Sequence, residues 1–220
     1  MHRVYPEDIA AEIEQPNLLD LIQRFIYKQQ SHHGHDSDSD SSVSALPTFY
    51  GKITVYPSAV ATFHAPSDIS GIGGMRRERI RAVKSWRKGP GRYDTIFVNT
   101  DPSESMEGME GLEVARVRLF FSFSHDNVEY PCALVHWFSR VGDLPDDHTG
   151  MWVVEPDITD DGEPFTSIIH LDTIVRASHL LPVFGQGRVL KTLTFTNTLD
   201  TFTRFYVNKY IDHHAFEIAF

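Results

Sequence analysis

EVARVRLFFSF (residues 113–123) and VEYPCALVHWFSRV (residues 128–141) are the two stretches that decide the fold class of this 220-residue chain. Each is long, alternates in polarity and is rich in Val, Phe and Trp, which is the pattern of a half-buried strand. The polar residues between them, SHDN (124–127), have the length and composition of a short hairpin loop. The sequence therefore predicts a long antiparallel β-hairpin.

Shorter β-rich runs lie on both sides of this hairpin and are separated by turn residues. Their spacing is typical of a small barrel or a curled sheet. We therefore expect a mostly β fold of the α+β class, a small curled sheet or partly open barrel with a helix near each end. The expected strands are residues 52–57, 59–65, 93–99, 150–156, 165–171 and 178–184.

Two segments have the 3.6-residue periodicity of amphipathic helices. In residues 17–30, NLLDLIQRFIYKQQ, the apolar side chains fall on one side of a helix, and Asn17 is suited to cap its N-terminus. In residues 197–210, NTLDTFTRFYVNKY, Thr198 or Asn197 is suited to the same role, and we expect a closing helix there. The apolar faces would consist of Leu18, Leu21, Ile22, Phe25 and Ile26 in the first helix, and of Leu199, Phe202, Phe205 and Tyr206 in the second.

Residues 31–44 contain almost no apolar side chains and are rich in Ser, Asp and His. Such a segment cannot bury enough apolar surface to offset the entropy lost on ordering it, so we expect a disordered linker. The chain would then consist of an N-terminal amphipathic helix in residues 1–30, an acidic Ser-rich linker in residues 31–44, and a β-rich accessory domain in residues 45–220.

The chain carries 20 Lys and Arg residues against 30 Asp and Glu residues, a net charge of −10. A protein of this charge is repelled by a polyanion on average, so any contact with nucleic acid must be local and salt-dependent. The single cysteine, Cys132, excludes an internal disulfide, and no apolar run approaches the roughly 20 residues of a membrane-spanning helix. We expect no membrane association and a reducing intracellular location, nuclear or cytoplasmic.

Residues 71–92, GIGGMRRERIRAVKSWRKGPGR, concentrate basic charge next to a glycine cluster. Glycines before a helix, expected here over about residues 75–85, can hold phosphate, but no Walker loop or full dinucleotide fingerprint is present. Eight bases beside Trp86 and Tyr93 instead have the elements for phosphate contact and base stacking. The competing interpretation is a solvated helix whose arginines pair with carboxylates elsewhere. The candidate nucleic-acid-binding residues are Arg76, Arg77, Arg79, Arg81, Lys84, Trp86, Arg87, Lys88 and Arg92.

A second candidate is the loop DLPDDHTGMW, residues 143–152, which places acidic side chains beside a tryptophan. Such a loop can hold a cationic ligand by charge and by cation–π attraction. The alternative is an aromatic pair in the core next to a solvated turn. The candidate pocket residues are Trp137, Asp143, Asp146, Asp147 and Trp152.

The residue types of a catalytic site are present, but their spacing is unsuitable. Cys132 and His136 share one expected strand four residues apart, much farther than a hydrogen bond. The histidines of HHGH (32–35) and the pair His213-His214 lack the spacing of a closed zinc site. We therefore expect no enzymatic activity, no catalytic residues, no metal site and no cofactor.

Long parts of the sequence resemble the C-terminal region of Plavaka-type DNA transposases of mushroom-forming fungi. FHAPSDISGIGGMRRERIRAVKSWRKGPGRYD (63–94) and YPCALVHWFSRVGDLPDDHTGMWVVEPD (130–157) carry this resemblance, which runs from about Leu18 to Phe220. In that family this region follows an RNase H-like domain with the catalytic DDE carboxylates, for which nothing before Leu18 leaves room. The resemblance implies an accessory module, a fragment or a relic, with DNA and possibly a transposase catalytic chain as partners.

The order of a strand, an acidic loop, a long hairpin and SIIHLDTIVRASHLLPV (167–183) also resembles that of bromo-adjacent homology domains, which are chromatin-reading β-barrels. If this resemblance holds, the pocket residues named above would bind a histone tail. Fold alone does not establish function.

We therefore expect a non-catalytic accessory module derived from a fungal DNA transposase, which binds nucleic acid or chromatin. The alternative is a protein–protein interaction or self-association module, in which the N-terminal helix and HHAFEIAF (213–220) contact another chain.

Overall fold

The chain is built around the long hairpin that the sequence predicts, and its computed structural model describes residues 2–33, 46–67, 71–100, 108–185, 187–189 and 191–220. β7 (Glu113–His125) and β8 (Val128–Arg140) pair antiparallel over almost their whole length. Asp126 and Asn127 join them with positive φ values of 51° and 63°, as a type I′ hairpin turn requires. The predicted hairpin is confirmed.

Each outer edge of this hairpin carries two shorter strands, one along each half. β6 (Thr95–Val98) and β2 (Ile53–Tyr56) pair with β7, while β9 (Val153–Pro156) and β10 (Thr166–His170) pair with β8. A β-bulge between Val117 and Leu119 separates the two halves of β7. A bulge bends the strand that contains it and increases the local twist, so the hairpin curves.

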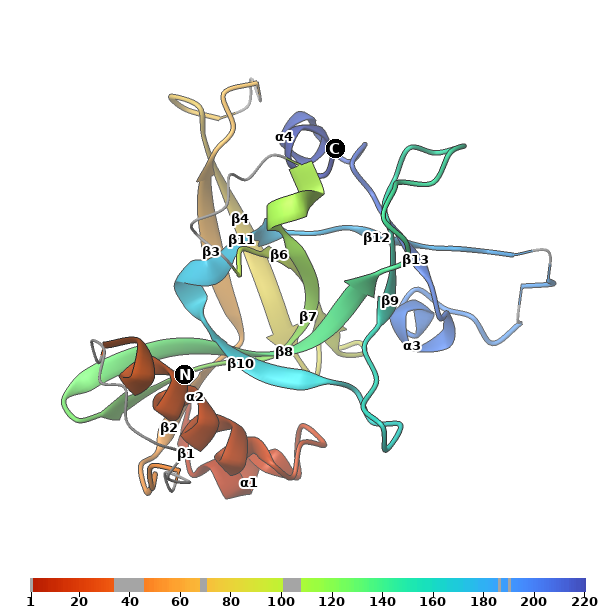
Figure 1. The fold of residues 1–220 in the computed structure, drawn as a ribbon. Helices are drawn as coiled ribbons and strands as arrows, with labels where there is room; N and C mark the ends of the chain where they lie inside the picture. The colour runs from red at the N-terminus through yellow and green to blue at the C-terminus, as the bar shows by residue number, and fades with distance from the viewer. Residues whose placement is uncertain (1, 34–45, 68–70, 101–107, 186, 190) are drawn as a thin grey trace, which may run out of the picture.

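The chain also crosses from one edge of the sheet to the other, which requires a strong curl. After β10 it passes through one turn of 3-10 helix (Leu171–Thr173) into β11 (Ile174–Ala177), which pairs with β6 on the far side of the hairpin. Two consecutive strands therefore lie at opposite ends of the order β10-β8-β7-β6-β11. The expected mostly β fold with a curled, half-barrel sheet is confirmed (Figure 1).

Three more strands extend the ends of the sheet. β1 (His2–Val4) pairs with β2, and β13 (Phe205–Val207) lies between β9 and β12 (Leu180–Pro182). A separate three-stranded sheet consists of β3 (Ser58–His64), β4 (Met75–Val83) and β5 (Arg92–Tyr93).

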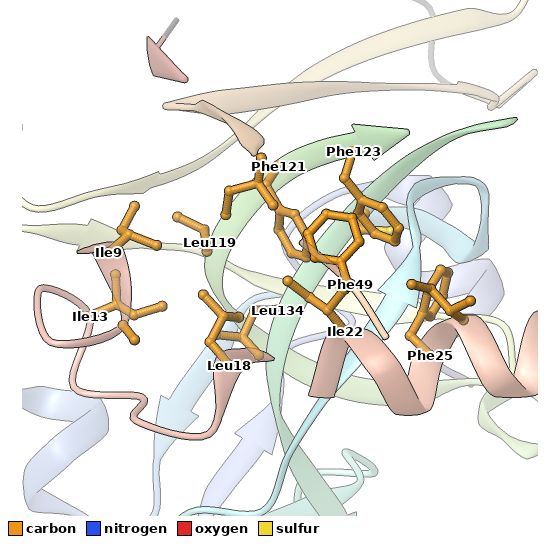
Figure 2. Close-up of a cluster of buried hydrophobic side chains, with 14 residues drawn as sticks. Ile9, Ile13, Leu18, Ile22, Phe25, Phe49, Leu119, Phe121, Phe123 and Leu134 are labelled. Carbon is orange, nitrogen blue, oxygen red and sulfur yellow. The ribbon is translucent and has the colours of Figure 1, made fainter. Parts of the chain in front are cut away.

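The N-terminal helices cover the half of the sheet that contains the end of β7. α2 (Leu18–His33) has the apolar face expected of it, and this face packs on β7 and β8 beside α1 (Pro6–Ala10). Leu18, Ile22 and Ile26 are fully buried. Figure 2 shows this cluster, which includes Ile9, Ile13, Leu18, Ile22, Phe25, Phe49, Leu119, Phe121, Phe123 and Leu134.

The expected linker falls mostly outside the described residues. Residues 31–33 form the last turn of α2, and residues 34–44 are not described. The linker and the domain boundaries drawn from it therefore stay predictions, although the helix before it packs on strands from the part after it.

The helix expected at about residues 75–85 is wrong, because this segment is strand β4. β3 pairs with it antiparallel from Ser58–Arg81 to His64–Met75. Ile80 and Ala82 are buried, Arg81 between them is half-buried, and Arg77 and Arg79 before them are exposed; this alternation is the period of a strand. The partner strand and the sheet beneath it override the helical propensity of the Arg- and Glu-rich sequence.

The helix expected over residues 197–210 is also wrong. Only α3 (Thr198–Thr201) forms, and the chain then extends into β13, where Phe205 and Val207 are fully buried with half-buried Tyr206 between them. Pairing with β9 and β12 supplies the backbone hydrogen bonds that a helix would have made. The C-terminal helix is instead α4 (His213–Ile218).

Within the described residues, no helix combines the length and the apolarity needed to cross a membrane.

Candidate functional site

The β3–β4 ribbon separates its side chains onto two faces by strand alternation. Arg77, Arg79 and Arg81 of β4 point to the outside of the ribbon, while Arg76 and Glu78 point to the inside. The neighbours of the outward arginines across the ribbon are short side chains, which leave the guanidinium groups accessible. We call this surface the arginine face: Arg77, Arg79 and Arg81 of β4 with Thr62, Val60 and Ser58 of β3.

The turn that follows β4 continues the arginine face. The backbone N–H of Gly89 donates to the carbonyl of Trp86 at 2.9 Å, which closes a four-residue turn. Arg87 and Lys88 at its centre have positive φ values of 52° and 65°, so the turn belongs to the I′ class. Long side chains are uncommon in this left-handed conformation, which Gly, Asn and Asp favour.

Trp86 lies among the guanidinium groups of this region. The central guanidinium carbons of Arg81, Arg87 and Arg92 lie 4.2, 5.4 and 5.9 Å from the centre of its indole ring. All three distances are within the range of a cation–π interaction. The ring therefore brings together bases from the end of β4, the turn and the start of β5.

Two bases of the region have acidic partners. Arg92 Nε donates to Asp94 Oδ1 at 2.6 Å, and Lys84 Nζ lies 3.1 Å from Glu12 Oε1 in the N-terminal segment. The other bases of the arginine face and the turn have no carboxylate within 4.0 Å among the described residues; these are Arg77, Arg79, Arg81, Arg87 and Lys88. The structure therefore gives little support to the interpretation in which these arginines pair with carboxylates elsewhere.

The charges in this region repel one another. The pKa of Arg81 is lowered by partial burial and then by the positive charge of Arg92, against which Asp94 acts in the opposite direction. Arg79 and Arg87 lower it further. An anion bound between these side chains would relieve the repulsion.

The inner face of the ribbon is anchored by one buried arginine. Arg176 of β11 donates through both terminal nitrogens to Asp212, at 2.8 and 2.6 Å, and its Nε lies 3.7 Å from Glu78 Oε2 of β4. Only 4% of its side chain is exposed. The hydrogen bonds from Arg176 lower the pKa of Asp212 to about 2, so this carboxylate stays ionised.

Two rings complete the anchor. His214 of α4 stacks on Phe63 of β3 with ring centres 4.7 Å apart, and its Nδ1 lies 3.2 Å from a terminal nitrogen of Arg176. Burial and then the charge of Arg176 lower the pKa of His214, which favours the neutral imidazole. The ribbon is thus held in place from its inner side by β11 and α4 (Figure 1).

The structure brings together most of the predicted nucleic-acid-binding residues. Arg76 is the exception, since it lies on the inner face, where its charge acts on Asp212. Lys84 is directed to Glu12. The residues that share the arginine face and the turn after it are Arg77, Arg79, Arg81, Trp86, Arg87, Lys88 and Arg92.

Arg118 of β7 is a base that the sequence reasoning missed. Its guanidinium carbon lies 4.8 Å from the ring centre of Tyr93, and that of Arg116 lies 5.7 Å from the same ring. Arg116 is paired with Asp200 at 2.5 Å, whereas Arg118 has no carboxylate within 4.0 Å among the described residues. The two-residue spacing of these arginines within an expected strand was the signal that could have identified them.

The structure places the two tryptophans of the candidate pocket apart from each other. Trp137 and Trp152 belong to different buried clusters, and each indole N–H has a partner, Ser167 Oγ at 2.7 Å and the carbonyl of Phe220 at 3.4 Å. Both side chains are buried. They act as core residues, as the alternative interpretation held.

Asp146 and Asp143, two of the acidic residues predicted for the pocket, have different surroundings. Asp146 Oδ1 accepts hydrogen bonds from His148 N, Thr149 N and Thr149 Oγ1, and these bonds lower its pKa. Asp143 and Trp152 line a cleft of about 610 Å³ together with Arg140. Glu113 lines the same cleft, and the guanidinium carbon of Arg140 lies 5.3 Å from the centre of the Trp152 ring, in the position that a cationic ligand would take.

Cys132 is fully buried in β8, and burial raises the pKa of its thiol far above the ordinary value. Burial also lowers the pKa of His136, whose Nε2 lies 3.2 Å from the carbonyl oxygen of Asp157. In the described part of the chain, no three His, Cys, Asp or Glu side chains gather where they could hold a metal ion.

Comparison of the chain with protein-family models, with curated proteins and with solved structures gives no match.

Proposed function

We propose that this chain is a non-catalytic module that binds nucleic acid or chromatin through the arginine face and the turn after β4. The observation that carries the proposal is a concentration of cations, five of which have no acidic partner among the residues that the structure describes, on a protein of net charge −10. The resemblance to the C-terminal region of fungal Plavaka-type transposases supports a transposase-derived role, with a transposase catalytic chain as a further partner. A chromatin role would place the protein in the nucleus.

The spacing of the arginine face suits a phosphate backbone. Residues two apart in a strand are about 6.6 Å apart. Arg77, Arg79 and Arg81 therefore form a regular row of positive charges, which suits a chain of phosphates. Their short neighbours on β3 leave room for this approach.

The turn after β4 provides independent support. Asp126 and Asn127 show which residues this kind of turn favours, yet Arg87 and Lys88 occupy the same conformation. The left-handed region costs a residue with a Cβ atom roughly 1–2 kcal/mol. Local folding does not explain the two cations, whereas contact with an anion does.

Self-association is a second candidate, favoured by exposed aromatic residues near the C-terminus. Tyr210, Phe216 and Phe220 are 59%, 43% and 71% exposed, and their rings form a contiguous group with centres about 6 Å apart. The apolar face of α2, the other surface considered for this role, is covered by the protein's own sheet.

The test of the proposed function is a titration of labelled nucleic acid with the purified protein at about 50 and 200 mM salt. We expect binding at the lower concentration and a steep loss of affinity at the higher one. A variant with Arg77→Ala, Arg79→Ala and Arg81→Ala should bind at least about tenfold more weakly, with a shallower dependence on salt, because up to three phosphate contacts are removed.

A charge-matched variant controls for net charge. Arg3→Ala, Lys28→Ala and Lys191→Ala also remove three exposed bases, but none of them belongs to the β3–β4 ribbon. This variant should bind nearly as well as the wild type. Absence of binding by the wild type at about 50 mM salt would overturn the proposal, and equal losses in the two variants would show that the arginine face is not the site.

A further inference from the structure

We infer that the nucleic acid bound by this surface is single-stranded and that one of its bases stacks on Trp86. The inference rests on the proposed function, since it specifies the ligand of the same site. It depends on three features of the structure: the position of Trp86, the guanidinium groups near its ring, and the side chains of the arginine face.

The position of Trp86 differs from that of the other two tryptophans. Trp137 and Trp152 are buried in the core and are 8% and 7% exposed. Trp86 is only half-buried, lies in the turn after β4 and belongs to none of the three buried clusters. Packing of the core therefore does not explain a tryptophan at this position.

Guanidinium groups of three arginines lie within cation–π distance of the indole ring. Arg81 is the closest, at 4.2 Å, with Arg87 and Arg92 farther out. A planar guanidinium and a planar base make the same kind of stacked contact with an indole ring. A base can thus replace Arg81 on the ring, while the freed guanidinium binds the adjoining phosphate.

The ring of Trp86, not the arginine face, distinguishes a single strand from a duplex. Arg77, Arg79 and Arg81 can contact guanine edges and phosphates of a duplex as well as the phosphates of a single strand. A ring in a turn can stack on a base only if that base is unpaired. A line of cations that ends at an aromatic ring is typical of sequence-tolerant single-strand binding.

The test compares three ligands of equal length at one salt concentration: a single strand, a duplex, and a strand of abasic sites. Oligo(dT) and oligo(rU) serve as the single strands, because phosphates and bases occur in both DNA and RNA. We expect single strands to bind at least about tenfold more tightly than abasic strands. The same binding should change the fluorescence of Trp86.

Two variants test whether the preference for single strands depends on the indole ring of Trp86. Trp86→Leu should weaken binding of single strands about tenfold and should leave binding of the abasic strand within about twofold of the wild type. Phe195→Leu is the matched control, because Phe195 is 92% exposed and lies outside the ribbon. This control should bind all three ligands as the wild type does.

The possible outcomes separate this inference from the proposed function. Equal or tighter binding of the duplex, or an unchanged affinity of Trp86→Leu for single strands, would overturn the single-strand inference and leave nucleic-acid binding intact. Failure of all three ligands to bind would overturn the proposed function as well. A preference for oligo(dT) or oligo(rU) would identify the natural ligand as DNA or RNA and would support the inference in either case.

Discussion

Arg87 and Lys88 have the backbone conformation of Asp126 and Asn127 at the tip of the β7–β8 hairpin, but they have different chemistry. Asp and Asn tolerate positive φ because their short side chains form hydrogen bonds with nearby backbone groups, and Arg and Lys lack this compensation. Asp126 and Asn127 therefore suit the turn that they occupy, whereas the backbone conformation of the other turn does not account for Arg87 and Lys88. The sequence predicted the β7–β8 turn from the polar residues SHDN (124–127). It contained no signal for a turn with Arg87 and Lys88 at its centre.

Replacing Arg87 and Lys88 with Asn and Gly should therefore have opposite effects on stability and on binding. We expect the double variant to be more stable by about 1 kcal/mol, because Asn-Gly is the preferred central pair of a type I′ turn. It should also bind nucleic acid several-fold more weakly. Urea unfolding and the titration described above measure the two effects.

The matched change in the other turn, Asn127→Gly, should also stabilise the protein but should leave binding unchanged. If the Arg87→Asn, Lys88→Gly variant binds as tightly as the wild type, the two cations do not contact the ligand. If it is less stable than the wild type, the strain assigned to this turn is wrong.

Asp212→Ala should destabilise the protein by about 3 kcal/mol, because the more distant Glu78 is then the only carboxylate within 4.0 Å of the buried Arg176 among the described residues. Asp212 also caps α4 by accepting a hydrogen bond from Ala215 N at 2.7 Å. Asp212→Asn keeps a cap acceptor but removes the charge, so its loss should be smaller. Chemical denaturation of the three proteins measures these differences, and an Asn variant as stable as the wild type would show that the charge contributes nothing.

At the scale of elements, the sequence predicted the helix and strands whose polarity pattern extends over many residues. The two strands of the β7–β8 hairpin and the helix α2 have patterns that extend over ten or more residues, and all three form as expected. β4 contains Met, Arg, Glu and Ala, which favour helices, and it becomes a strand because of β3 and the sheet beneath it. The segment after α3 becomes strand β13 for the same reason, since its partners β9 and β12 are distant in sequence.

For the candidate site, too, the sequence predicted what is local and missed what depends on distant strands. The sequence identified most of its basic residues, because a concentration of charge is a local property. It placed them on a helix, so it could not assign Arg76 to the opposite face from Arg77. It also missed Arg118, which reaches Tyr93 only through the pairing of distant strands. The arrangement of a site depends on tertiary pairing even where its composition does not.

Ile22→Ala in α2 should cost about 2–5 kcal/mol, because Ile22 is fully buried against the sheet and the substitution leaves a cavity. Lys28→Ala on the exposed side of the same helix should change the stability by no more than about 0.5 kcal/mol. Thermal or urea unfolding measures both. A small effect of Ile22→Ala would mean that α2 is an appendage of the β-rich part and not a component of its core.

At the scale of the whole molecule, the arginine face belongs to a sheet separate from the main one. The bases lie on a three-stranded sheet that is distinct from the ten-stranded sheet, and the inner side of that small sheet is anchored by β11 and α4. Because the whole chain has a net charge of −10, attraction of a polyanion is confined to this face.

The stability of the whole molecule should fall in two stages as the pH is lowered. The pKa values of His136 and His214 are lowered by burial, so the folded state binds fewer protons than the unfolded state below about pH 6.5, and stability decreases there. The depressed pKa of Asp212 contributes stability above its ordinary value of 3.8, and this contribution is lost as the pH falls towards about 2. Glu113, whose pKa is raised by burial, acts in the opposite direction.

Urea midpoints measured between about pH 8 and pH 2 would show the two stages. His214→Gln should flatten the first stage and leave the second. A midpoint that stays constant between about pH 7.5 and pH 5 would contradict the assignment of the first stage to buried neutral histidines.

The ion pairs that link Glu78, Arg176 and Asp212 also have a consequence for the time at which the protein becomes active. A ribosome adds about 5–20 residues per second, and β4 emerges long before β11 and α4 are made. Until then, the inner side of the ribbon packs on β7 but lacks the ion pairs of Arg176 with Glu78 and Asp212. The arginine face therefore becomes fully anchored only after α4 has been made.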